Sequence, residues 1–152
     1  MKKKYHIGYT QGTFDLFHVG HLNLLEHAKE QCDYLVVGIN SDKLVEEYKN
    51  KDANISEQDR ARIEGALKEV DKVIITDTLN KKDALDKIHF DAIFICDDWK
   101  GNERWKKTEE ELSKYGVPVE YLPYTKGIST TDLSEKIKNH KGKENNDWNK
   151  RW

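Results

Sequence analysis

The residues Gly12-Thr13-Phe14-Asp15-Leu16-Phe17-His18-Val19-Gly20-His21 decide the fold of this chain. Segment 6–10 before them is short and mostly apolar or β-favouring, which predicts a buried first strand. Apolar residues recur at helical spacing over 22–28, so the quoted stretch is a strand-to-helix turn. A helix that begins near Val19 directs its unpaired amides and the positive end of its dipole at the turn, which predicts an anion site suited to phosphate.

The composition of the chain predicts one α/β domain. A length of 152 residues allows a real core but not two substantial domains. Charged residues make up 36% and nearly balance at a net charge of -2, which argues against general binding to nucleic acids or membrane surfaces. We find no signal peptide or membrane anchor and expect a cytoplasmic protein. Cys32 and Cys96 lack a Cys-x-x-Cys partner, so we expect buried, reduced thiols.

Apolar runs that alternate with helical patterns define the expected architecture. Strands are predicted at 6–10, 34–40, 72–77, 91–96 and 117–122, and helices from about Val19, from Ser56, over 81–89, over 103–115 and from Ser129. This alternation predicts a Rossmann-like, doubly wound parallel sheet of five strands in a single domain, residues 1–140, with ligands at the carboxyl ends of the strands. Residues 141–152, which include Trp148 and Trp152, are predicted to be a polar tail.

The segment around Ser56 carries two specific expectations. Segment 46–54 is rich in lysine and asparagine and lacks an apolar period, so we predict a loop. It is either a solvated surface loop or a lid whose lysines close over a polyanion. Ser56 then caps a helix with an acidic first turn. The buried face of this helix is predicted to comprise Ile63, Ala66, Leu67 and Val70.

Polar groups follow the second, fourth and fifth predicted strands, where such sheets place ligands. Asn40-Ser41-Asp42 could contact a ligand or form a turn and helix cap. Asp97-Asp98 could hold a metal or act as acid and base, or could cap the following helix. Ser129 has Asp132 three residues later and fits an ordinary helix start.

Two motifs resemble the nucleotidyltransferase superfamily that includes the cytidylyltransferases. His18-x-Gly20-His21 after Gly-Thr-Phe-Asp resembles its first signature, and segment 127–131, Gly-Ile-Ser-Thr-Thr, resembles its second, Arg-Thr-Glu-Gly-Ile-Ser-Thr-Thr. Asp-Asp-Trp-x-Gly at 97–101 is most similar to the glycerol-3-phosphate cytidylyltransferases. The resemblance covers residues 5–138 and implies a helix-flanked nucleotide site.

The resemblance implies roles for individual residues. His18 and His21 would hydrogen-bond phosphate oxygens and stabilise charge during attack on the α-phosphorus. Lys49 is the expected phosphate ligand in a mobile loop. Arg60 is expected to act in catalysis and to bind the acceptor phosphate. The other expected nucleotide-binding residues are Gly12, Thr13, Phe14, Asp98, Trp99, Thr125, Lys126, Gly127, Ile128, Ser129 and Thr130; the other expected acceptor-binding residues are Asp15 and Lys51, with Arg62 and Lys68 as secondary candidates.

One position departs from the second signature. Tyr124 stands where the family has arginine, and Lys126 stands where it has glutamate. The change removes a fixed cation from the nucleotide phosphates. Lys126 is the candidate to restore that charge, although an ammonium does not reproduce the fork of a guanidinium.

The resemblance implies a reaction in which an alcohol phosphate attacks the α-phosphorus of CTP and pyrophosphate leaves. A phosphate monoester is largely dianionic at neutral pH, its second pKa being about 6, and needs no general base. Mg²⁺ is expected with the triphosphate, with no metal site on the protein itself, and a homodimer is expected. Glycerol 3-phosphate is the leading acceptor. The alternatives are another alcohol or sugar phosphate, of the phosphoethanolamine or heptose phosphate type, with cytidylyl or adenylyl transfer, and a non-catalytic nucleotide-binding module.

Overall fold

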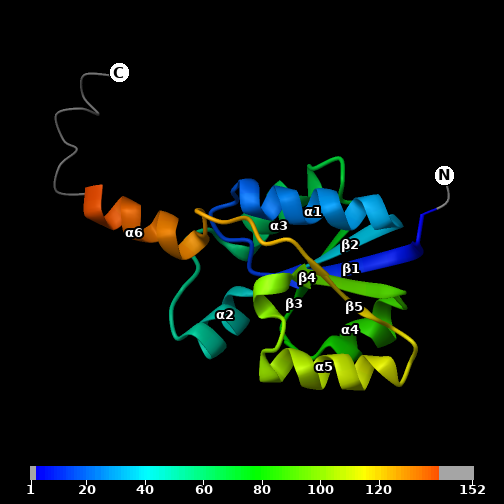
Figure 1. The fold of residues 1–152 in the computed structure, drawn as a ribbon. Helices are drawn as coiled ribbons and strands as arrows, with labels where there is room; N and C mark the ends of the chain where they lie inside the picture. The colour runs from blue at the N-terminus through cyan, green and yellow to red at the C-terminus, as the bar shows by residue number, and fades with distance from the viewer. Residues whose placement is uncertain (1–2, 141–152) are drawn as a thin grey trace.

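A computed structural model of the chain describes residues 3–140 and contains one five-stranded sheet (Figure 1). The strands are β1 (Tyr5–Gly12), β2 (Cys32–Asn40), β3 (Lys72–Thr76), β4 (Ala92–Cys96) and β5 (Val119–Leu122). They are parallel throughout and ordered β3-β2-β1-β4-β5. The predicted doubly wound parallel sheet is therefore confirmed, while the tail at 141–152 lies outside the described residues.

Helices cover both faces of the sheet and its carboxyl edge. They are α1 (Val19–Gln31), α2 (Asp42–Lys49), α3 (Glu57–Gly65), α4 (Lys81–Ile88), α5 (Glu103–Ser113) and α6 (Thr130–His140). Figure 1 shows α1 and α3 on one face, α4 and α5 on the other, and α2 and α6 beyond the carboxyl ends of the strands. Among the described helices, none has the length and apolar character needed to cross a membrane.

Two apolar clusters hold these layers together, one on each face of the sheet. Leu25 of α1 belongs to the first cluster, and Leu85 of α4 belongs to the second. The neighbouring residues Ile93 and Phe94 of β4 are buried in opposite clusters, because successive side chains of a strand point to opposite faces. A strand covered on both faces is continuously apolar, as its sequence shows.

The order of the strands reverses between β1 and β4. From β1 the chain builds outward through β2 and β3, then returns to place β4 and β5 on the other side. The turn after β1 leads into α1 on one face, whereas the turn after β4 leads toward α5 on the other. Such a switch point leaves a crevice at the carboxyl ends of the two strands.

The prediction of a loop over 46–54 is wrong for the first half of that segment, because α2 continues to Lys49. The Ser41 side chain accepts the amide of Leu44, and both Leu44 and Val45 are buried, so capping and packing stabilise a helix in a polar sequence. Asn50 ends it in the left-handed conformation, with φ of 54°. The helix cap predicted as one reading of Asn40-Ser41-Asp42 is confirmed for Ser41.

The buried face predicted for the helix after Ser56 is wrong for Ile63 and Ala66, which are exposed. Leu67 and Val70 do pack in the first apolar cluster, although both lie beyond the end of the helix, and the Ser56 cap is confirmed. The helix ends at Gly65, and Ile63 is 39% exposed. Its inward side chains are instead Arg60 and Glu64. The apolar periodicity gave the wrong buried face for this helix. Arg60 has hydrogen-bond acceptors inside the protein, and no linear pattern reveals them.

Glu64 is buried with both carboxylate oxygens lacking a hydrogen-bond partner, and burial raises its pKa to about 8. The carboxyl is therefore protonated in the folded state below that pH and ionised in the unfolded chain above its ordinary value of 4.5. The free-energy cost of ionising this buried carboxyl is absent at low pH, grows as the pH rises from 4.5 to 8, and is constant above pH 8.

We predict that Glu64→Leu raises the free energy of unfolding by roughly 4 kcal/mol more at pH 9 than at pH 5, because only at pH 9 does the folded protein carry the cost of ionising this buried carboxyl. Urea unfolding at both pH values measures the difference. Glu110→Leu, an exposed position on α5, is the matched control and should show no such pH-dependent gain. A gain at position 64 that is equal at both pH values would show that Glu64 is not protonated in the folded state.

Candidate active site

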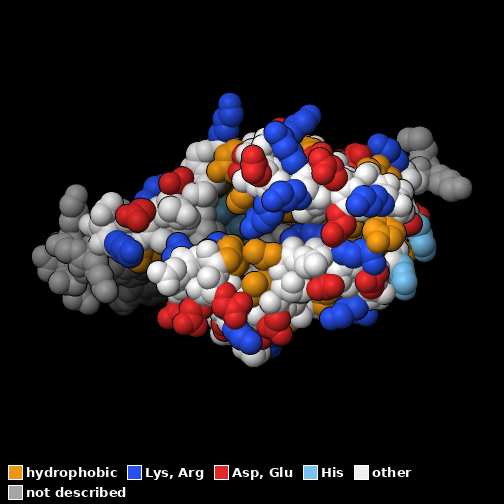
Figure 2. All heavy atoms as spheres, turned by 90° about the horizontal axis from the view of Figure 1, so that it is seen from below, with side chains coloured by type: hydrophobic (Ala, Val, Ile, Leu, Met, Phe, Trp, Pro, Cys, Tyr) orange, Lys and Arg blue, Asp and Glu red, His pale blue; other side chains and the backbone are white. Residues whose placement is uncertain are grey.

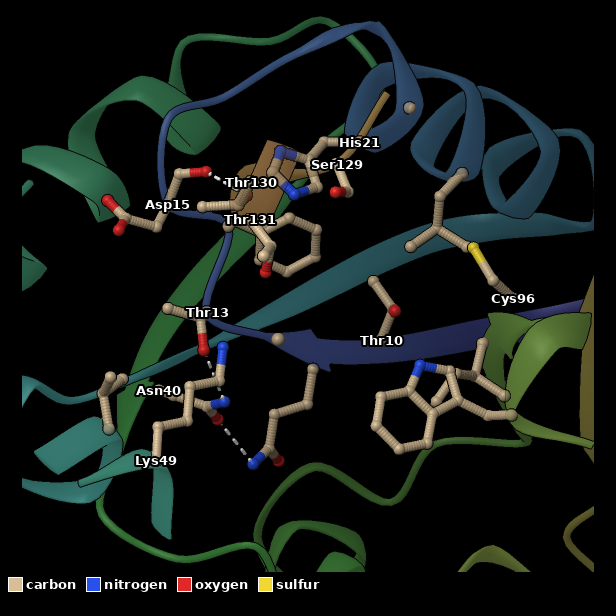
Figure 3. Close-up of a pocket in the computed structure, with 18 of the residues that line it drawn as sticks. Thr10, Thr13, Asp15, His21, Asn40, Lys49, Cys96, Ser129, Thr130 and Thr131 are labelled. Carbon is tan, nitrogen blue, oxygen red and sulfur yellow. Dashed lines mark hydrogen bonds between the residues drawn. The ribbon is translucent and has the colours of Figure 1, made fainter. Parts of the chain in front are cut away.

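A cavity of about 310 Å³ lies at the carboxyl ends of β1 and β4. Its lining comes from the end of β1 and the turn after it, the start of α1, the ends of β2, α2 and β4, and the starts of α4 and α5. Leu79 and residues 51–53, 98–99, 124–125 and 128–131 complete it (Figure 3). This is the crevice expected at the switch point. Figure 2 shows acidic and basic side chains interspersed over the face that carries α5, with no broad basic surface on that face.

The turn after β1 is held in shape by Asp15, which is buried. Its carboxylate accepts the amides of Leu16, Asn54 and Ile55 and the side-chain amide of Asn54. Phe14 and Leu16 on either side have φ of 53° and 49°, a conformation that costs energy outside glycine. The Asp15 carboxylate therefore offsets backbone strain in the signature turn. Its contact with the acceptor stays a prediction.

His18 and His21 form the start of α1 and stack on each other. Nδ1 of His18, the N-cap residue, accepts the amide of Gly20 at 3.0 Å, and Nδ1 of His21 accepts the amide of His18 at 3.3 Å. The ring centroids lie 3.8 Å apart, and the His21 ring also contacts Phe14 edge-on. Both histidines line the cavity, and their contact with phosphate stays a prediction. Their placement on a helix start is confirmed.

The charge and the tautomer of the two imidazoles follow from these contacts. Burial lowers the pKa of His21 to about 3, helped by the adjacent His18, and burial lowers the pKa of His18 as well. Both rings are neutral near pH 7. Because each Nδ1 accepts a hydrogen bond, the single proton of each ring is on Nε2. The site therefore offers two neutral Nε2–H donors rather than two cations.

A second helix start faces the first. Ser129 caps α6 by accepting the amide of Asp132, and Thr130 donates its hydroxyl to the Asp15 carbonyl. Figure 3 shows Ser129, Thr130 and Thr131 close to His21. Thr125 accepts a hydrogen bond from Asn23 of α1, which further ties the two helix starts together. The free amides of two helices therefore face one cavity, an arrangement suited to a polyphosphate.

A polar network covers the floor at the ends of β1 and β2. The Gln11 side chain donates to Asn40, and Asn40 donates to the hydroxyls of Thr13 and Tyr48, which are themselves 2.8 Å apart. All four residues line the cavity. Asn40 therefore serves the cavity, whereas Ser41 serves the cap of α2. The network offers hydroxyl and amide groups of the kind that bind a polyhydroxy substrate.

Lys49 and Lys51 line the cavity from the end of α2 and the following loop. Lys49 lies over the Tyr48 ring, 5.5 Å from its centroid. Within residues 3–140, neither lysine has a carboxylate at ion-pair distance. Both charges are therefore available to an anionic ligand.

Arg60 lies beneath this floor and outside the cavity lining. Its side chain is 0% exposed, donates to the carbonyls of Thr13, Asn40 and Ile55, and pairs with Asp42 at 2.6 Å. In this structure it joins the ends of β1 and β2, so a direct contact with substrate phosphate would require those bonds to break. Arg62, Lys68, Lys126 and Gly127 are exposed and also outside the lining.

The segment after β4 rules out one of the alternatives left open for Asp97 and Asp98, the helix cap. α5 is capped by Asn102, which accepts the amides of Arg104 and Trp105, so the aspartates are not its cap. Asp97 accepts the amide of Tyr124 instead, and Asp98 lines the cavity, where burial raises its pKa. Over residues 3–140, no three His, Cys, Asp or Glu side chains converge on a metal position.

The remaining lining residues complete the description. Trp99 and Tyr124 line the cavity, as do Thr125 and Ile128. Cys96 lines it too and is half-buried; burial raises the pKa of its thiol to about 11, so it is a poor nucleophile. Cys32 is buried, and both thiols are free, as predicted.

Residues 9–136 match the protein family described as Cytidylyltransferase-like. The chain belongs to this family. The glycerol-3-phosphate cytidylyltransferase of Bacillus subtilis (strain 168) is 41% identical over 130 residues, which cover 84% of this chain and 94% of the relative. The bifunctional protein HldE of Koribacter versatilis (strain Ellin345) is 39% identical over 128 residues, which cover 84% of this chain but 26% of the relative.

A solved structure shares the fold of this cytidylyltransferase-like chain. The lipopolysaccharide core biosynthesis protein from Thermoplasma volcanium GSS1 superposes with a TM-score of 0.67 at 24% identity, covering 82% of this chain and 99% of the other. The chain spans nearly the whole length of the Bacillus subtilis relative and about a quarter of the length of the Koribacter versatilis relative.

Sequence reasoning missed several lining residues of this family member. Gln11, Tyr48, Lys81, Arg104 and Trp105 belong to no motif that we used. The signal that could have found Lys81 is its place after β3, at the same sheet edge as the other ligands. Tyr48 was hidden because we expected a loop where α2 places it beside Thr13.

We predict that nitrogen chemical shifts of the free protein show His18 at pH 7 and His21 at pH 6 as neutral rings protonated at Nε2. The reason is the burial of both rings and the amide donated to each Nδ1. Assignment uses His18→Gln and His21→Gln. A doubly protonated His21 at pH 6 would contradict the assigned burial and hydrogen bonds.

Proposed function

We propose that this chain transfers CMP from CTP to an alcohol phosphate and releases pyrophosphate, with glycerol 3-phosphate as the acceptor. The observation that carries the proposal is the pair of helix starts, α1 and α6, that face one cavity with two neutral Nε2–H donors between them. Similarity along nearly the whole glycerol-3-phosphate cytidylyltransferase of Bacillus subtilis supports this acceptor. A cytoplasmic location and a homodimer, expected from the sequence, are part of the proposal.

The triphosphate would lie against the starts of α1 and α6. Their amides and the hydroxyls of Ser129 and Thr131 are donors matched to its oxygens, whereas the Thr130 hydroxyl is already donated to the Asp15 carbonyl. Nε2–H groups of His18 and His21 would donate to oxygens around the α-phosphorus, where negative charge redistributes during transfer. Neutral donors suit this place because their hydrogen bonds strengthen as charge develops.

The acceptor phosphate would be the nucleophile. One of its oxygens forms a bond to the α-phosphorus while the bond from that phosphorus to the α,β-bridging oxygen breaks, and the electron pair leaves with pyrophosphate. A dianionic phosphate has no proton to lose, so no general base is required. Lys49 and Lys51 would offset the charge that accumulates when two anions approach. Positioning and charge compensation are then the main contributions of the protein.

Mg²⁺ fits this cavity as an ion that the triphosphate carries. Such ions commonly use substrate phosphates, waters and one or two carboxylates rather than an all-protein cage. Asp98 and Asp52 line the cavity, whereas the oxygens of Asp15 are already engaged. Asp98 and Asp52 are therefore the candidate carboxylates. The ion would neutralise phosphate charge in the bound nucleotide.

We predict that pyrophosphate release, measured with each of the four triphosphates against alcohol and sugar phosphates, is fastest with CTP and glycerol 3-phosphate. His18→Ala and His21→Ala should each lower kcat by about a hundredfold or more, with a much smaller change in the Kd for CTP. A preference for ATP with a sugar phosphate would support the alternative acceptor class. Nucleotide binding without turnover by any pair would support the non-catalytic alternative.

We predict that Lys49→Gln and Lys51→Gln each raise the Kd of a phosphorylated substrate by about tenfold, because each removes a charge-assisted hydrogen bond. Lys43→Gln is the matched control on α2, since Lys43 is exposed and outside the lining. Amide exchange of residues 50–53 should also slow when CTP binds. Unchanged exchange with nucleotide bound would remove the lid role from this segment.

A further inference from the structure

Tyr48, near the end of α2, joins that helix to the turn after β1. Its hydroxyl lies 2.8 Å from the hydroxyl of Thr13 in the turn. The side-chain amide of Asn40, at the end of β2, donates to both hydroxyl oxygens, at 3.2 Å to Tyr48 and 3.3 Å to Thr13. The next residue of the helix, Lys49, has its ammonium 5.5 Å from the centroid of the Tyr48 ring. One side chain therefore contacts both a cation of α2 and a hydroxyl of the signature turn.

The hydrogen bonds around this contact have a fixed direction. The Thr78 carbonyl can only accept, so the amide nitrogen of Gln11 faces it, and the same nitrogen donates to the side-chain oxygen of Asn40. The nitrogen of Asn40 therefore faces Thr13 and Tyr48. It donates one of its two protons to each hydroxyl oxygen.

The two hydroxyls leave one proton for a ligand. Only one proton lies between the two oxygens, and a phenol is a stronger donor than an aliphatic hydroxyl, so Tyr48 donates to Thr13. The Thr13 oxygen then accepts two hydrogen bonds, and within residues 3–140 its own proton has no acceptor. Because Thr13 lines the cavity, this proton is available to an oxygen of a bound molecule.

The group that suits this proton and Lys49 together is an anionic oxygen. Figure 3 shows Thr13, Asn40 and Lys49 at one end of the cavity. In the part of the chain that the structure describes, Lys49 has no carboxylate at ion-pair distance. A hydroxyl proton and an ammonium are both donors, and a phosphate oxygen accepts from both. Lys49 also precedes the left-handed residue Asn50, so Tyr48 holds it in place before the chain leaves the helix.

We propose that Tyr48 is a positioning residue, which holds Lys49 and the Thr13 hydroxyl together so that both donate to the phosphates of the bound nucleotide. Its hydroxyl directs the Thr13 proton into the cavity, and its ring supports the Lys49 ammonium. This inference rests on the proposed function, which supplies the triphosphate. It assigns a role in nucleotide affinity to a residue that belongs to neither signature.

A double-mutant cycle on the Kd of CTP, measured by calorimetry, tests the action of Tyr48 through Thr13. Tyr48→Phe keeps the ring and should raise the Kd about threefold to tenfold, and Thr13→Val should raise it about tenfold. The double variant should bind CTP no more weakly than Thr13→Val alone, because the Tyr48 hydroxyl would have no proton left to direct. Thr13→Ser keeps a hydroxyl and should restore most of the affinity. Tyr34→Phe, an exposed tyrosine outside the lining, is the matched control and should leave the Kd unchanged.

A second cycle tests the support of Lys49 by the ring. Tyr48→Leu removes the ring as well as the hydroxyl, so it should raise the Kd of CTP by a further factor of about two to five beyond Tyr48→Phe. This further factor should vanish when both variants carry Lys49→Gln. Its persistence without the ammonium would show that the ring acts on the fold of α2 and not through Lys49.

The outcomes separate this inference from the proposed function. Additive effects of Tyr48→Phe and Thr13→Val, or an unchanged Kd in Tyr48→Phe, would overturn the positioning role while nucleotide binding stands; melting temperatures show that the variants are folded. If the unaltered protein binds no CTP, the proposed function fails. The same cycles with pyrophosphate then decide the positioning role, and a lack of binding to pyrophosphate as well would overturn both proposals.

Discussion

The buried guanidinium of Arg60 is the interaction on which the site most depends. It donates to the carbonyls of Thr13 and Asn40, so the carboxyl ends of β1 and β2 are held at one spacing. Its other donors reach Ile55 and Asp42, which adds the loop before α3 and the start of α2. A charged group of this size is stable inside a protein only when its donors are satisfied, and here every arm has an acceptor. The floor of the cavity is consequently rigid where substrates would meet.

The Asp15 carboxylate holds the turn after β1 in place, as Arg60 holds the ends of the strands. It binds three backbone amides and one side-chain amide, and the Asp15 carbonyl accepts the hydroxyl of Thr130. These hydrogen bonds link the signature turn, the loop at 54–55 and the start of α6. Phe14 and Leu16 keep their strained backbone conformation because the hydrogen bonds of this carboxylate stabilise it. Asp15, a residue of the first signature, thus stabilises the conformation of that signature.

The cavity is lined by many hydrogen-bond donors and several cations, although the chain as a whole is slightly acidic. Helix amides, neutral imidazoles, two flexible lysines and the pair of Lys81 and Arg104 surround a volume of about 310 Å³. The positive character is local, because acidic and basic side chains alternate elsewhere on the visible face (Figure 2). Such an arrangement attracts two phosphorylated molecules without making the surface generally adhesive to polyanions. It also shows how a cytidylyltransferase-like chain with a net charge of -2 could hold the charged substrates of the proposed reaction.

The alternation of apolar runs determined the parallel sheet, and Gly12 to His21 determined that a helix start faces the end of β1, because both depend on local periodicity and capping. The second helix start at Ser129 was equally readable. Only the tertiary structure decided that Asp42 to Lys49 is a helix and that Arg60 and Glu64, not Ile63, face inward. It also brought Lys81 of α4 beside Arg104 and Trp105 of α5. The physical reason is that buried polar groups are stabilised by partners from distant segments, and no periodicity along the chain encodes which segments will meet.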